Sequence, residues 1–169
     1  MIMKTKNFLY TVLVIACCGI AACFTACGGD DDDKDMNKPV ISNQGITANP
    51  IDCQEYHRGE TIPFCYTFTD DVELGNFNIE VHSNHDHHTH STSAVECEEE
   101  HEHEEGHQSV KPWVYNHDYE IPAGQRTYTA RVDIAIPTDI DEGDYHFMIR
   151  VTDRAGWQEL KSVAIRIEE

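Results

Sequence analysis

The residues with the clearest chemistry lie in "HSNHDHHTHSTSAVECEEEHEHEEGHQ", residues 82–108, which hold eight of the eleven histidines, eight carboxylates, one cysteine and no aromatic residue. Neutral imidazole is the commonest metal ligand; thiolate and carboxylate complete the set used by zinc, and copper also accepts imidazole. We therefore predict that divalent metal ions, zinc or copper, bind to this stretch and to one further histidine placed by the fold. The candidate ligands are His82, His85, His87, His88, His90, Cys97, His101, His103, His107 and His146.

Other interpretations of this stretch stay open. A closed structural zinc site fixes four ligands at defined spacing, and none of the usual spacings occurs here, so several exchangeable sites or a weak collector of ions are expected. A solvated insertion without a metal is also compatible, because lengthening a connection from roughly 4 to roughly 28 residues costs only about 1.5–2 kcal/mol. A proton sensor is a third alternative, since clustered histidines gain charge below about pH 6.5 and could then pair with glutamates.

The charge of the chain narrows its partners. Thirty-one acidic residues against twelve basic ones give a formal net charge of −19, which repels nucleic acid and favours cations. The sequence has no phosphate-binding glycine loop, no nucleophile elbow and no paired-histidine metalloprotease motif, so we expect no enzyme.

The N-terminal segment is typical of an export signal. Lys4 and Lys6 precede an apolar run and then small residues that end at cysteine, as in a secretory signal peptide. It resembles a bacterial lipoprotein signal, in which the cysteine is lipidated and becomes the mature N-terminus. We expect lipidation at Cys27, with Cys23 as the alternative. Residues 1–26 are then the signal and 27–37 an acidic tether.

The tether also bears on location. An acidic run directly after the lipidated cysteine resembles the signal that sends Bacteroidetes lipoproteins to the outer face of the outer membrane. We expect a lipid-anchored protein on the cell surface, with a periplasm-facing anchor as the second choice.

Three cysteines remain in the mature chain: Cys53, Cys65 and Cys97. Export permits disulfides, but an odd count leaves at least one thiol free or bound to metal. Cys53 and Cys65 are the expected pair, which leaves Cys97 among the histidines.

The scaffold must come from residues 38–169, which lack a helical period of useful length. Short alternating runs separated by turn residues predict strands. Removing a 28-residue insertion at 83–110 leaves 104 residues, close to an immunoglobulin-type domain. We predict an all-β, immunoglobulin-like, seven-stranded antiparallel sandwich with a His/Glu-rich inserted loop. The expected strands are 38–43, 61–70, 75–83, 113–121, 126–136, 144–153 and 159–168.

Alternation within strands predicts which side chains face the core. In 61–70, Ile62, Phe64, Tyr66 and Phe68 point inward and Cys65 points outward. In 75–83, His82 points outward; in 144–153, His146 and Met148 do so. In an immunoglobulin topology these last two strands are antiparallel neighbours. His82 should then lie near His146 on the outer face, as a rigid half-site beside the insertion.

A local motif supports this fold. In "DEGDYHF", residues 141–147, Tyr145 stands where immunoglobulin domains place the tyrosine that bonds to backbone upstream. Phe147 occupies the position of the usual cysteine, so apolar packing should replace an inter-sheet disulfide there.

Together with the lipoprotein start, "KPVI", "LGNFNIEVHSNHDHHTH" and "GDYHFMIRVTDRAG" resemble a Bacteroidetes lipoprotein family known only as domain of unknown function 4625. The resemblance implies an immunoglobulin-like fold and no settled activity. Our first hypothesis is a surface-anchored lipoprotein that binds zinc or copper, for an outer-membrane transporter or another envelope protein. The alternative is an adhesion or accessory binding module in which the loop is incidental.

Overall fold

The computed structural model describes residues 34–84, 97 and 111–169. The expected signal peptide and both candidate lipidation sites, Cys27 and Cys23, lie outside the described residues. Residues Asp35–Glu169 form one compact unit, which starts three residues before the expected boundary. Within the described part of the chain, nothing helical is long and apolar enough to cross a membrane.

The described residues of this unit form eight strands, and each of the seven expected strands is found. The strands are β1 (Val40–Ser42), β2 (Gln54–His57), β3 (Thr61–Thr69), β4 (Leu74–Ser83), β5 (Tyr115–Glu120), β6 (Thr127–Ala135), β7 (Gly143–Asp153) and β8 (Gln158–Glu168).

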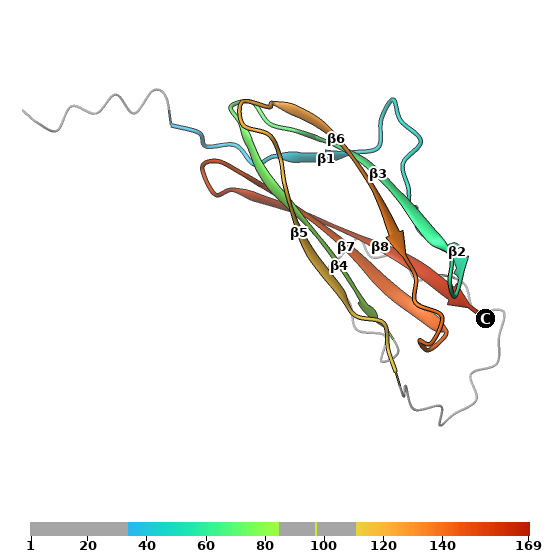
Figure 1. Cartoon of the computed structure of the whole chain (residues 1–169). Helices are drawn as coiled ribbons and strands as arrows, with labels where there is room; N and C mark the ends of the chain where they lie inside the picture. Colours follow the sequence, from blue (N-terminus) through green and yellow to red (C-terminus); the bar gives the residue numbers. More distant parts are fainter. Residues whose placement is uncertain (1–33, 85–96, 98–110) are drawn as a thin grey trace, which may run out of the picture. The chain divides into compact units, whose positions relative to one another are not determined.

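The strands form two sheets that pack face to face (Figure 1). One sheet has the order β1-β3-β6 and the other β2-β8-β7-β4-β5. β3 pairs with β6 along its whole length, from Thr61 opposite Ala135 to Thr69 opposite Thr127. This arrangement confirms the predicted immunoglobulin-like sandwich.

Two details of the prediction are wrong: there are eight strands rather than seven, and β2 runs parallel to β8. β2 has only four residues, too few for alternation to stand out in the sequence. β2 forms because of the path of the chain after β1. The chain first makes an isolated bridge to β3, between Asn49 and Cys65, and then passes to the other sheet, where it pairs with β8. The Tyr66 hydroxyl donates a 2.6 Å hydrogen bond to the Pro50 carbonyl and holds this crossing in place.

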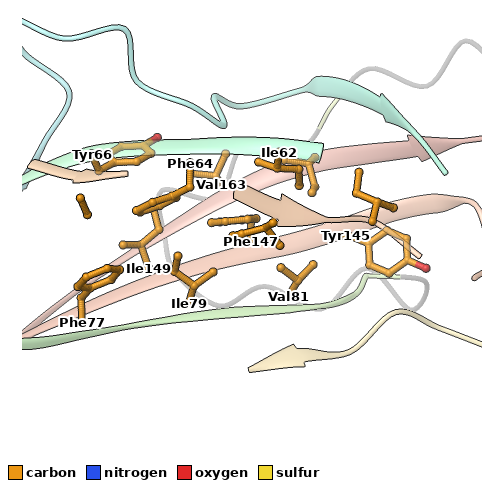
Figure 2. Packing of buried hydrophobic residues seen from close by; sticks show 14 of the residues in the cluster. Ile62, Phe64, Tyr66, Phe77, Ile79, Val81, Tyr145, Phe147, Ile149 and Val163 are labelled. Carbon is orange, nitrogen blue, oxygen red and sulfur yellow. The ribbon is translucent and has the colours of Figure 1, made fainter. Parts of the chain in front are cut away.

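The core follows the predicted alternation. Ile62, Phe64, Tyr66 and Phe68 of β3 are almost fully buried, and Figure 2 shows three of them facing side chains of β4, β7 and β8 across the sandwich. The Phe64 ring centroid lies 6.2 Å from that of Phe77 and 5.9 Å from that of Phe147. Each such buried side chain contributes about 1.5–3 kcal/mol to folding.

The predicted tyrosine corner is confirmed. The Tyr145 hydroxyl donates to the Asp141 carbonyl at 2.7 Å and accepts from the Trp113 backbone N–H at 3.2 Å. Phe147 is fully buried, so apolar packing does replace a disulfide at that position.

Three side chains expected on the outer faces are nevertheless buried. Cys65 is 4% exposed, and the segment around Asn49 pairs with β3 at that residue. His146 and Met148 are 4% and 7% exposed. Their strand, β7, lies between β8 and β4, whose outward side chains stand beside them on both sides. Alternation predicts correctly which face of the sheet a side chain points to. It does not predict burial, because side chains of the two neighbouring strands cover a side chain on an interior strand.

Candidate metal site on the outer face of the five-stranded sheet

His82 and His146 lie side by side, as predicted. The antiparallel register of β4 and β7 places the two residues directly opposite each other. Their ring centroids are 5.6 Å apart, with an interplanar angle of 56°. Directly opposed residues on one face of an antiparallel pair are the closest side-chain neighbours in a sheet. The backbone of two long strands therefore fixes this histidine pair.

Glu80 lies two residues before His82 and so projects from the same face of β4. Its Oε1 atom is 3.1 Å from His82 Nδ1, in an ion-pair contact rather than an aligned hydrogen bond. A carboxylate at one ring nitrogen is the usual way to orient a ligating histidine and raise its basicity.

The spacing of the two rings suits a shared ion. Zinc–nitrogen bonds of about 2.0–2.1 Å in tetrahedral geometry place the centroids of two coordinating rings roughly 5 Å apart. The observed 5.6 Å is close to that value.

The pair supplies half of a tetrahedral site. In the ranges that the structure describes, neither histidine belongs to a group of three residues whose ligand atoms all lie within 4.8 Å of one another. The remaining predicted histidine ligands fall outside the described residues: His85, His87, His88, His90, His101, His103 and His107.

The prediction for the cysteines is wrong. Cys97 forms a disulfide with Cys53, with a Cα–Cα distance of 5.4 Å, and Cys65 is a free, buried thiol. A disulfide sulfur is not a thiolate, so Cys97 is no metal ligand in this state. No sequence signal identified the true pair, because the β2–β8 pairing that positions Cys53 was itself not predicted.

The disulfide lies in the same row of the sheet as the histidine pair. The Cys53 backbone N–H donates to the Ala164 carbonyl at 2.8 Å, Ala164 pairs with His146, and His146 pairs with His82. These residues form one row across the sheet, and neighbouring strands are about 4.8 Å apart. Cys97 is thus tied to the edge of the same row that contains the two histidines. The insertion leaves β4 on one side of His146 and is fastened at Cys97 on the other.

The arginine near the histidine pair already forms an ion pair with a carboxylate. Arg166 Nε donates to Asp144 Oδ1 at 2.9 Å, and Asp144 lies on the same face of β7 as His146, two residues earlier. Because this cation is paired with Asp144, it offsets less of the negative field around the histidines.

Comparison with known proteins places the chain in a family without assigning an activity. No curated protein matches it. One solved structure, the GspB Siglec domain, aligns with 79% of this chain at 17% identity and a TM-score of 0.40; the match spans 59% of that structure. The family model described as "Domain of unknown function (DUF4625)" matches residues 25–168. The chain therefore belongs to the DUF4625 family, as the motifs around residues 75–90 and 143–156 predicted.

Proposed function

We propose that this protein is a lipid-anchored protein of the cell envelope that binds a divalent transition metal, zinc or copper. In this proposal His82 and His146 form the rigid half of the best site, and histidines of the insertion supply the other ligands. The single observation that carries the proposal is the cross-strand contact between these two rings, 5.6 Å apart.

A rigid pair of ligands should give one metal site a higher affinity than the many exchangeable sites of the insertion. Ligands on a loop must lose conformational freedom when they bind, whereas ligands fixed by strands have already lost it on folding. A site that includes His82 and His146 orders fewer residues than a site made only of loop histidines. It should therefore bind metal more tightly than the surplus of ligands in the insertion.

The covalent attachment of the insertion supports the same proposal. The insertion follows directly after His82 and is held at Cys97 by the disulfide to Cys53. In this proposal the disulfide adds one attachment to the two chain ends of the insertion, which raises the effective concentration of its histidines near the pair. Glutamates and the net charge of −19 further favour cations.

The anchor and the partner belong to the proposal as well. The lipoprotein-like start and the acidic tether support a lipid anchor at Cys27, or at Cys23, on the cell surface. A site of this kind would capture the ion for an outer-membrane transporter or another envelope protein. Mass spectrometry of the mature N-terminus distinguishes Cys27, Cys23 and an uncleaved chain.

The decisive experiment is calorimetric titration of the full-length chain in detergent with zinc and, separately, with copper. We expect one site tighter than the rest, and the variant His82→Ala/His146→Ala should lose that site, with its affinity reduced about 10–100-fold. The matched control is His57→Ala/His117→Ala, which removes two exposed histidines on other strands. Equal binding isotherms for both double variants and the wild type would refute the role of the pair.

A second candidate function is binding of a protein or glycan at the β5 edge. Tyr115, His117 and Tyr119 form a row there, with 2.5 Å between the two tyrosine hydroxyls and 4.9 Å between the His117 and Tyr119 ring centroids. Because β5 is the outer strand of its sheet, these rings stay partly accessible, and aromatic rings offer contact area at low entropic cost. A glycan array probed with wild type and Tyr119→Ala tests this alternative.

A further inference from the structure

A second cluster of ligand atoms lies at the opposite end of β4 from the histidine pair. One carboxylate oxygen from each of Asp35, Asp70 and Asp71 lies within 4.8 Å of the other two. Asp35 begins the compact unit, and the other two follow β3 in the turn to β4. His82 is eight residues beyond the start of β4 at Leu74, about 27 Å along the strand.

The backbone and a few side chains hold the three carboxylates in place. Asp35 Oδ1 accepts from the Asn37 N–H at 3.1 Å, and Asp71 Oδ2 accepts from Asn37 Nδ2 at 2.8 Å. The Trp157 indole N–H donates to the Asp35 carbonyl at 3.0 Å and fastens the entering chain to the β7–β8 hairpin. The two Asn37 contacts each use one oxygen of a carboxylate and leave its second oxygen for another partner.

Asp70 gives independent reason to expect a ligand. Its side chain is only 9% exposed. Oδ1 accepts from the N–H groups of Val72 and Glu73 at 2.9 and 2.7 Å, whereas Oδ2 is buried and has no hydrogen-bond partner. A buried, unpartnered carboxylate oxygen costs several kcal/mol unless a cation or donor compensates it.

The ion pairs of the described residues do not include this cluster. Among the residues that the structure describes, no lysine, arginine or histidine nitrogen lies within 4.0 Å of Asp35, Asp70 or Asp71. Three carboxylates this close repel one another, most strongly where one of them is buried.

We propose that Asp35, Asp70 and Asp71 bind a calcium ion, at a site separate from the histidine pair and different in chemistry. All donors are oxygens, which selects a hard cation rather than zinc or copper. Calcium takes 6–8 oxygen ligands in flexible geometry, which suits carboxylates from a turn and an entering chain, whereas magnesium demands near-ideal octahedral geometry and usually keeps several waters. The exposed sides of Asp35 and Asp71 leave room for water ligands. The bound ion would hold the entering chain on the β3–β4 turn.

Terbium luminescence tests the position of this site, because terbium replaces calcium on oxygen ligands and is sensitised by a nearby tryptophan. We expect full-length protein to show terbium emission on tryptophan excitation, and calcium to displace it. Trp157→Phe should abolish the emission but keep calcium binding. Emission that persists in Trp157→Phe would place the ion elsewhere and overturn the assignment.

Calcium titration of the full-length chain tests the ligands. We expect a dissociation constant on the order of 0.1–1 mM, as in other extracellular calcium modules. Asp70→Asn and Asp71→Asn should each weaken it about tenfold or more, because fewer charged ligands remain. Asp133→Asn, an exposed carboxylate on β6, is the matched control.

The variants are chosen to stay folded. Asn at position 70 keeps an oxygen for the Val72 and Glu73 N–H groups, and Asp71 is exposed. Circular dichroism of each variant checks this point. Wild-type calcium affinity in both Asp70→Asn and Asp71→Asn, or no saturable calcium binding by the wild type, would overturn the proposal.

Discussion

Cys53 and Cys97 are joined across 44 residues, at the edge of the row that leads through Ala164 to His146 and His82. The bond closes a large loop that contains β2, β3, β4 and the first part of the insertion. A cross-link of this kind restricts the unfolded chain and so stabilises the folded one.

Removal of this disulfide should lower the free energy of unfolding substantially. The chain-entropy relation gives about 4 kcal/mol for a loop of this length. We expect Cys53→Ser/Cys97→Ser to unfold at clearly lower urea concentration than the wild type. Reductant should lower the urea midpoint of the wild type and leave that of the double variant unchanged. A double variant with the wild-type midpoint would show that the bond does not form in the folded protein.

The second prediction concerns the tyrosine corner formed by Tyr145. Tyr145→Phe deletes the donor to the Asp141 carbonyl and the acceptor for the Trp113 N–H while it keeps the ring. Because the Trp113 contact is buried, we expect the free energy of unfolding to fall by about 1–3 kcal/mol. Tyr128→Phe is the control, since its ring is partly exposed and its hydroxyl makes no hydrogen bond with the residues that the structure describes. Equal urea midpoints for the two variants would contradict the prediction.

The third prediction concerns Gly75, which packs closely against the backbone of β7. A Cβ atom at this position would lie 2.9 Å from the carbonyl oxygens of both Thr152 and Asp153. Backbone cannot move aside as a flexible side chain can, so Gly75→Ala should cost about 1–3 kcal/mol. Asn76→Ala, at the exposed neighbouring residue, should cost much less. Thermal unfolding of both variants measures the difference, and similar melting temperatures would show that β4 and β7 separate easily there.

The sequence predicted the parts of this molecule that depend on period-2 alternation. Ile62, Phe64, Tyr66 and Phe68 repeat strictly, and one face of a strand must be buried, so both the strand and its core face could be inferred. The His82–His146 contact was predicted from alternation and the immunoglobulin strand order together, because the end of one antiparallel strand lies beside the start of its neighbour.

The parts that were missed depend on contacts between segments far apart in the chain. β2 is stabilised by its parallel pairing with β8, more than 100 residues later, and not by its own pattern. The partner of Cys53 depends on that pairing, so three cysteines could not reveal it. The Asp35 cluster was missed for the same reason, since it joins the tether to a turn 35 residues away.

Alkaline pH provides the last prediction. Burial is the main cause that raises the pKa of Tyr56 and of Tyr66 to about 12, from an ordinary value near 10. Nearby carboxylates add to the effect, Glu60 for Tyr56 and Asp52 for Tyr66. Between about pH 10 and about pH 12 the unfolded chain therefore loses these protons while the folded chain keeps them.

The sign follows from this difference in bound protons. The stabilisation is complete below about pH 10 and is lost as the pH rises toward about 12, by up to about 1.4 kcal/mol per pH unit for each tyrosine. Urea unfolding at a series of pH values should show this decline in the free energy of unfolding. In Tyr66→Phe the decline should be less steep, because one of the two buried tyrosine hydroxyls is absent. A wild-type stability that stays constant over this range would mean that both buried hydroxyls ionise without unfolding.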